Sequence, residues 1–127
     1  MSKRPAPAKS ELEVARIVWK LGGATARQVL DAMPAERGLD FKTVQTYLRR
    51  LESKGYLKTE REGRSNVYRP TVRPGKVIGE VMDDVLKSLF DGQVLSLFQH
   101  FVNDRGLSED EVRQLRDLLD RLEEEPR

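Results

Sequence analysis

The polar side chains between residues 41 and 54 have the types and spacing best suited to a chemical task. Gln pairs with adenine, Arg pairs with guanine, and the methyl group of Thr contacts the methyl group of thymine. No acidic residue occurs from position 41 to position 51. The segment therefore predicts contact with DNA, with a plain solvated helix face as the alternative. The candidate residues are Lys42, Thr43, Gln45, Thr46, Arg49 and Arg50.

A helix must carry these side chains for them to enter a DNA groove together. Val44, Leu48 and Leu51 fall on one helical face, which predicts a helix from about residue 41 to 54 with the polar candidates on the opposite face. Asp40 is a good N-cap for this helix. Lys42 and the residue after it would lie in its first turn, where the free N–H groups attract phosphate oxygens.

A shorter helix is predicted just before this one. Thr25-Ala26-Arg27-Gln28 has the form of a capping box, and Pro34 ends the apolar run that follows. In a helix-turn-helix, the first helix crosses the DNA backbone and the second enters the major groove. Thr25 and Arg27 are therefore candidates for DNA contact, with helix capping and solvation as the alternative roles.

Residues 56–61 and 66–70 alternate in polarity on either side of a polar tip that contains Gly63. This pattern predicts a β-hairpin, and a short strand near Ala24 could pair with it. Glu60 and Glu62 dilute the positive charge of the hairpin, so we expect it to add affinity rather than sequence choice. Its candidates for DNA contact are Arg61, Arg64 and Tyr68.

The first helix is expected to open at Ser10, because Ser10-Glu11-Leu12-Glu13 has the Ser-x-x-Glu form of a capping box, and to end at Gly22-Gly23. The order up to residue 71 is therefore helix, helix, helix, hairpin. This predicts a mainly α fold with a small β-hairpin, in which residues 1–75 form a winged helix-turn-helix DNA-binding domain. The chain ends, residues 1–8 and 123–127, are expected to be frayed.

Residues 76–127 predict three amphipathic helices with strongly apolar faces. So short a segment cannot bury three such faces within itself. A second copy of the chain would cover them, which predicts a helical dimerisation domain, whereas docking of this segment on residues 1–75 is the alternative. The predicted interface residues are Val81, Val85, Leu89, Leu97, Phe98, Phe101, Leu115, Leu119 and Leu122.

The net charge of +2 hides an asymmetry between the two parts of the chain. Residues 1–75 carry a net charge of +8, whereas residues 76–127 carry −6. A basic part suits a polyanion such as nucleic acid, which would repel the acidic part. Two-fold symmetry would present two basic domains to a palindromic site whose half-sites lie about 10 bp, or a multiple of it, apart.

Composition argues against several other classes of protein. The chain of 127 residues has no Cys and a single His, so we expect no metal site and no cofactor. There is no Gly-rich phosphate loop and no credible catalytic group, so no enzymatic activity is expected. No apolar run approaches the ~18 residues of a membrane span, and the opening residues lack the apolar stretch of a secretory signal. We therefore expect a cytoplasmic protein without membrane insertion.

The sequence also resembles a known family, the winged-helix repressors of the penicillinase repressor group. The matching segments are Ser10–Val14, Ile17–Trp19, Thr43–Leu51, Lys54–Leu57, Phe90–Gly92 and Leu97–Phe101. The resemblance covers about residues 9–124 and implies a homodimer that blocks a promoter with its recognition helices. It also implies regulation by a sensor protease, and the pair that corresponds to the family's Asn-Phe cleavage site is His100-Phe101. The cysteine metal site of the copper-responsive relatives has no counterpart here.

Two functional hypotheses follow from these observations. The first is a sequence-specific repressor that binds double-stranded DNA as a homodimer, with the helix over residues 41–54 in the major groove of a palindromic operator. The alternative is a winged-helix module that binds another protein and whose basic face is incidental.

Overall fold

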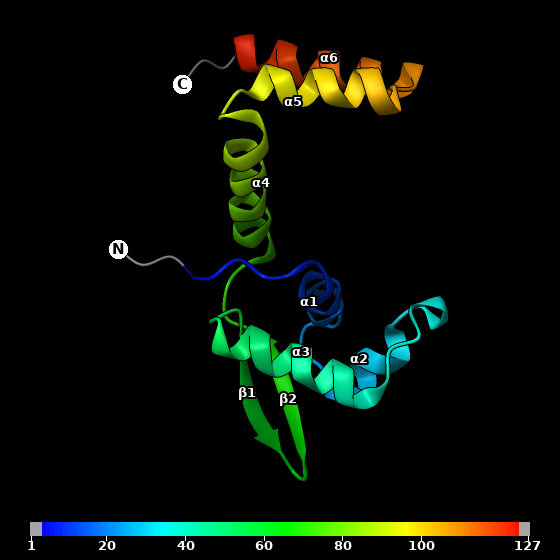
Figure 1. The fold of residues 1–127 in the computed structure, drawn as a ribbon, viewed down its shortest axis with the longest axis vertical. Helices are drawn as coiled ribbons and strands as arrows, with labels where there is room; N and C mark the ends of the chain where they lie inside the picture. The colour runs from blue at the N-terminus through cyan, green and yellow to red at the C-terminus, as the bar shows by residue number, and fades with distance from the viewer. Residues whose placement is uncertain (1–3, 125–127) are drawn as a thin grey trace. The chain divides into compact units, whose positions relative to one another are not determined.

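The computed structural model describes residues 4–124, which divide into a first unit up to Val81 and a second unit from Met82 onward. Figure 1 labels the α-helices and β-strands along the chain. In chain order the elements are α1 (Lys9–Leu21), α2 (Ala26–Ala32), the 3₁₀ turn η1 (Ala35–Arg37), α3 (Phe41–Ser53), β1 (Leu57–Glu62), β2 (Ser65–Pro70), α4 (Pro74–Phe90), α5 (Val94–His100), the π-helical turn η2 (Phe101–Arg105) and α6 (Glu109–Glu124). The predicted fold class, mainly helical with one hairpin, is confirmed.

The predicted caps of α2 and α3 are confirmed. Thr25 Oγ1 accepts a hydrogen bond from the Gln28 N–H at 3.1 Å, and the Gln28 side chain accepts one from the Thr25 N–H at 2.9 Å. Asp40 Oδ1 accepts from the Thr43 N–H at 2.8 Å. These bonds satisfy N–H groups that have no partner inside the helix, so they fix where both helices begin.

The predicted cap of α1 is wrong. The helix begins at Lys9, so Ser10 lies within its first turn and Ala8 takes the N-cap position. The Ala8 N–H donates to Glu11 Oε1 at 3.0 Å, which supplies one half of a capping box, because Ala has no side-chain oxygen for the other half. At the other end, α1 stops at Gly22, whose φ of 72° is a left-handed conformation that favours glycine.

The hairpin and the bridge to Ala24 are confirmed. Strands β1 and β2 pair antiparallel, with Thr59 opposite Tyr68. The backbone of Ala24 exchanges two hydrogen bonds with that of Tyr68, at 3.0 and 2.8 Å. This pairing joins the hairpin to the turn between α1 and α2.

The face of α3 that periodicity predicts to be buried packs in the core of the first unit. Val44, Leu48 and Leu51 are 0 % exposed and pack with Val14 and Val18 of α1. Burial of this apolar surface is the dominant favourable term in folding. The polar face of α3 therefore points away from the core.

Both predicted frayed ends are wrong where the structure describes them. Residues 4–8 form hydrogen bonds with α3 and with Tyr56, and residues 123 and 124 continue α6. Residues 1–3 and 125–127 of those predictions lie outside the described residues.

The second unit is helical throughout and starts within α4. Its last helix, α6, begins with a capping box, in which Ser108 Oγ accepts from the Glu111 N–H at 3.1 Å and Glu111 Oε1 accepts from the Ser108 N–H at 3.0 Å. None of the described residues from 82 to 124 is buried. Among the described residues, no helix combines the length and apolar character that crossing a membrane requires.

Glu11 is a charged side chain in the core of the first unit, and it is 2 % exposed. Its Oε1 lies 2.7 Å from Lys54 Nζ, at the C-terminal end of α3. Burial alone would raise the pKa of the Glu11 carboxyl, but the hydrogen bonds from Lys54 and Ala8 and the positive charges of Lys54 and Arg50 outweigh burial and hold the pKa below its ordinary value. The carboxylate therefore ties α1 to α3.

This ion pair makes stability depend on pH in a defined direction. Because the pKa of Glu11 is lower in the folded than in the unfolded chain, its contribution is complete above about pH 4.3 and is lost as the pH falls through the folded value. We expect Lys54→Met, which leaves the carboxylate without its cation, to lower the free energy of unfolding by about 1–3 kcal/mol at pH 7 and by less near pH 3. Urea unfolding at both pH values measures the difference. Lys20→Met, at an exposed lysine that forms no ion pair with another described residue, is the control, and equal losses at both pH values would contradict the prediction.

Candidate nucleic-acid interface

The outer face of α3 is positively charged and unneutralised. Lys42, Arg49 and Arg50 are exposed, and none forms an ion pair with another residue of the described chain. Gln45 and Thr46 lie between these cations and are half-buried. This face therefore offers both charge for phosphates and groups suited to base edges.

Two threonines of this face already form hydrogen bonds within the chain. Thr46 Oγ1 donates to the Lys42 carbonyl oxygen at 3.0 Å, so its methyl group is the part left for an apolar contact. Thr43, which is half-buried, donates its backbone N–H to the N-cap Asp40. Hydrogen bonds to Thr43 lower the pKa of the Asp40 carboxyl, so this cap is ionised at neutral pH.

One hollow gathers predicted residues from three separate elements. Its volume is about 280 Å³, and it lies where the start of α2, the first turns of α3 and the tip of the hairpin meet. Five of the predicted DNA-contact residues line it: Thr25, Arg27, Gln45, Arg64 and Tyr68. Residues that are 43 positions apart in sequence, such as Thr25 and Tyr68, thus belong to one surface.

The same hollow contains residues that the sequence analysis missed, namely Phe41, Ser65 and Asn66. The Arg27 guanidinium lies 4.8 Å from the centre of the Phe41 ring, a cation–π contact that limits the directions in which this arginine can point. Asn66 is an exposed side chain on β2. The sequence placed Asn66 on a strand of the hairpin. Its amide was overlooked because only cationic and aromatic residues of the hairpin were considered as candidates for DNA contact.

Fewer charged side chains of the hairpin are free than its sequence suggests, and this holds for acidic and basic residues alike. Arg69 Nε and Nη2 lie 2.6 and 2.7 Å from Glu60 and Glu62, respectively. The hydrogen bonds from Arg69 and Lys58 hold the pKa of Glu60 below its ordinary value. The two carboxylates that were expected to dilute the charge are therefore paired within the hairpin, Glu60 with Arg69 and Lys58, and Glu62 with Arg69.

Arg61 and Arg64 remain exposed on the hairpin, and Arg61 Nε donates to the Gly63 carbonyl oxygen at 3.1 Å. Tyr68 is different, because it is 6 % exposed and packs in the core. The contribution of Tyr68 to this surface is therefore to hold β2 in place, with little of the side chain left to touch DNA.

Arg69 also fixes the hairpin to the turn after α1. Its Nη1 donates to the Gly22 carbonyl oxygen at 3.2 Å. A Cβ atom at Gly23 would lie 2.6 Å from the same nitrogen, and Gly23 has a φ of 125°. Glycine is thus required there both for the backbone conformation and for the close approach of Arg69.

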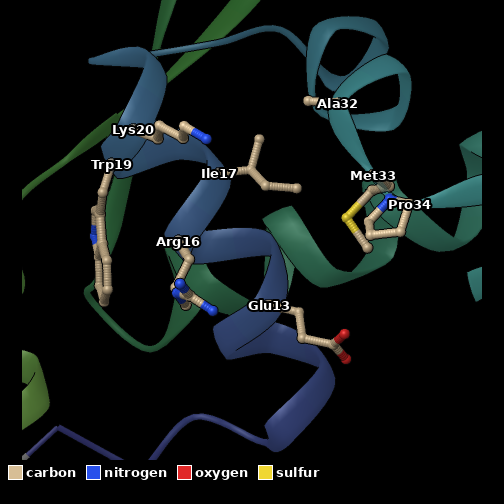
Figure 2. Close-up of a pocket in the computed structure, with 8 residues that line it drawn as sticks. All are labelled: Glu13, Arg16, Ile17, Trp19, Lys20, Ala32, Met33 and Pro34. Atoms are coloured by element: carbon tan, nitrogen blue, oxygen red, sulfur yellow. The ribbon is translucent and has the colours of Figure 1, made fainter. Parts of the chain in front are cut away.

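A larger hollow of the first unit lies elsewhere, between α1 and the end of α2. Figure 2 shows the residues that line this space of about 620 Å³, which include Arg16, Trp19 and Met33 but none of the predicted DNA-contact residues. Trp19 packs against the core, as expected for a structural tryptophan. Among the described residues, no group of three His, Cys, Asp or Glu side chains is arranged to hold a metal ion.

The predicted interface residues of the second unit are largely uncovered. Val85, Leu89, Phe98, Phe101, Leu119 and Leu122 are all more than one-third exposed. Leu97 and Leu115 are half-buried. Val81 belongs to the first unit, where it packs against the core, so in this chain it is already partly covered.

The fold and this surface define a class, the winged-helix DNA-binding proteins. Two helices of a helix-turn-helix are followed by a hairpin wing, and the second helix carries unneutralised cations. The family model described as penicillinase repressor matches residues 7–121. The chain therefore belongs to the penicillinase repressor family, and it is a DNA-binding transcriptional regulator of the repressor type.

Several other proteins are similar to this chain over most of its length. The penicillinase repressor of Bacillus licheniformis is 30% identical over 120 residues, which cover 94% of each chain. An uncharacterized 16.5 kDa protein of Latilactobacillus sakei is 37% identical over 117 residues, which cover 87% of this chain and 75% of that protein. The methicillin resistance regulatory protein MecI of Staphylococcus aureus strain N315 is 25% identical over 88% of this chain and 91% of MecI.

Several solved structures are similar to all or part of this chain. The DNA-binding domain of the repressor BlaI has a TM-score of 0.51 and 35% identity, covering 58% of this chain and 90% of that one. The monomeric form of Bacillus licheniformis BlaI, in complex with the blaP half-operator, has a TM-score of 0.50 and 35% identity, covering 59% and 92%. MarR, with a TM-score of 0.52 and 19% identity over 93% and 77%, shows the same fold.

Removal of the Arg64 side chain at the hairpin tip should change the affinity for DNA but not the choice of sequence. We expect Arg64→Ala to weaken binding to every duplex by a similar factor and to reduce the slope of log K against log salt concentration by about 1, because a phosphate contact carries no base information. Titration of two unrelated duplexes at several salt concentrations measures both effects. A loss confined to one sequence would contradict the assignment.

Proposed function

We propose that this chain acts in the cytoplasm as a homodimeric repressor of a palindromic operator, with residues 1–75 binding DNA and residues 76–127 forming the dimer. The observation that carries the proposal is the unneutralised face of α3, joined in one hollow to the start of α2 and the tip of the hairpin. This arrangement would place α3 in the major groove and the wing beside the phosphates.

Sequence choice is assigned to Gln45 and Arg49, whose side chains can each form two hydrogen bonds with one base. Lys42, Arg50 and the hairpin arginines are assigned to phosphates. Arg27, held against Phe41 at 4.8 Å, is assigned to the DNA backbone at the edge of the hollow. Contacts with phosphates position the protein on the duplex, and contacts with bases choose the sequence.

The dimer is supported by the second unit itself. A folded domain normally buries a core, yet none of the described residues 82–124 is buried and large apolar side chains are exposed on α4, α5 and α6. Leu89 is 73 % exposed and Leu119 is 59 % exposed. An exposed apolar surface of this kind marks an interface, and a second copy would cover it with closed two-fold symmetry.

For the inducing signal, we propose cleavage between His100 and Phe101 by a regulatory sensor protease. These residues stand where α5 passes into the π-helical turn η2, and both are exposed. A cut there would separate α6 from the rest of the second unit and weaken the dimer. The mass of the chain recovered from induced cells would show or exclude the cut.

Two measurements test the proposal as a whole. Selection of bound fragments from random duplex DNA should return inverted repeats, and binding should weaken steeply with salt because several phosphates release counterions. Sedimentation should show a dimer. A monomer that binds no duplex at low salt would instead favour the alternative, a winged-helix module whose partner is another protein.

A further inference from the structure

An N-terminal strap, residues 4–8, connects three parts of the first unit. Arg4 Nη2 lies 2.9 and 2.7 Å from the two carboxylate oxygens of Glu80, on α4. The Arg4 guanidinium also lies 5.4 Å from the centre of the Tyr56 ring. Tyr56 Oη donates to the Pro5 carbonyl oxygen at 2.7 Å, and Lys54 Nζ donates to the Ala6 carbonyl oxygen at 3.3 Å. The strap therefore joins the end of α3 to α4.

The first turns of α4 are held on the first unit from other directions as well. Val77 is 2 % exposed and belongs to the core. Thr71, which leads into α4, donates its N–H to the Tyr56 carbonyl oxygen at 3.0 Å and its hydroxyl to the Gly55 carbonyl oxygen at 2.6 Å. Tyr56 thus forms hydrogen bonds both with the strap and with the segment before α4, so the same residue fixes both.

These contacts hold the first turns of α4. The helix has 17 residues and a length of about 25 Å. A swing of about 10° at its start would therefore move its far end by about 4 Å, close to the ~3.4 Å between successive base pairs. Val77 fixes where α4 begins, and the Arg4–Glu80 pair, one turn further along, resists a swing about that point.

We propose that Arg4 and Glu80 are positioning residues that set the half-site spacing the dimer accepts, by holding the first turns of α4 on the first unit. This inference rests on the proposed function, since it needs two copies joined through residues 76–127. The pair is partly exposed, with 28 and 36 % of the two side chains accessible, and ion pairs of this kind add little to stability. Its removal is therefore expected to change geometry rather than folding.

The test is a spacing series with the full-length protein. The probes are duplexes that carry the half-site selected by the wild-type protein as an inverted repeat, with spacers that differ by one base pair over a helical turn, together with a single half-site duplex. The test variant is Glu80→Gln. The matched control is Glu13→Gln, which breaks a similarly exposed ion pair with Arg37 (2.8 Å) that has no contact with α4.

We expect Glu80→Gln to lose about 3–10-fold in affinity at the best wild-type spacing and to accept neighbouring spacings more evenly, because the linked second contact becomes less favourable. Affinity for the single half-site should stay within about twofold, since the reading face is unchanged. The exchange Arg4→Glu with Glu80→Arg should restore part of the preference.

A Glu80→Gln profile identical to that of Glu13→Gln would overturn the inference and leave the repressor proposal intact. A wild-type protein that gains nothing from a second half-site at any spacing would overturn the proposed dimeric function and the inference with it.

Discussion

The variant Leu119→Asp is expected to be a monomer at micromolar concentration and to bind the full operator at least about 100-fold more weakly than the wild-type protein. Leu119 is 59 % exposed on α6, so its replacement removes little packing within one chain. In the proposed dimer, however, the new carboxylate would be buried in an interface formed by a part of the chain that is already negative. Loss of the dimer removes the linked second half-site contact, which accounts for the size of the effect.

Sedimentation gives the oligomeric state, and titration of full-operator and half-site duplexes gives the two affinities. Half-site affinity should not change. The control is Leu21→Asp, the same substitution at a leucine that is 49 % exposed in the first unit. A Leu119→Asp protein that remains dimeric would show that the proposed interface lies elsewhere.

The variants Arg49→Ala and Gln45→Ala are each expected to relax base preference at one position of the half-site. The loss against the preferred base should be about 1–3 kcal/mol, or roughly 5–150-fold, because a two-bond contact with one base is removed. Binding to unrelated duplexes should fall much less, and the fall for Arg49→Ala should reflect its charge alone. Selection from randomised duplexes, repeated with each variant, identifies the relaxed position.

Arg64→Ala is the matched control for this experiment, since it removes a cation from the same surface without removing a base contact. The three variants should therefore separate into two that change the selected sequence and one that does not. If all three weakened binding uniformly, the assignment of Gln45 and Arg49 to bases would be wrong.

Local signals in the sequence were sufficient for most of the first unit. The spacing of Val44, Leu48 and Leu51 gave the buried face of α3, and the buried face decides which side chains are left outside. The capping residues Thr25 and Asp40 act on N–H groups only three positions away. Such interactions depend on the helix period and on near neighbours, so they can be read before the fold is known.

Partners that are distant in sequence could not be read in this way. Glu11 serves as a cap acceptor because Lys54 holds its carboxylate, 43 positions later, and this long-range pair displaced the predicted start at Ser10. Arg69 pairs with both hairpin carboxylates, so these three groups are engaged with one another inside the wing. Each outcome depends on which of several oppositely charged side chains comes within a few ångströms, and charge attraction is too unspecific to select among them in sequence.

By itself, then, the sequence determined the order of the elements, the buried face of α3 and the residues available to meet DNA. The tertiary structure alone decided which of these share one surface, that Tyr68 lies in the core, and that residues 4–8 join α3 to α4. The physical reason is the range of the interactions, because helix periodicity and caps act over a few residues. Packing and ion pairing act through space, between side chains that only the completed fold brings together.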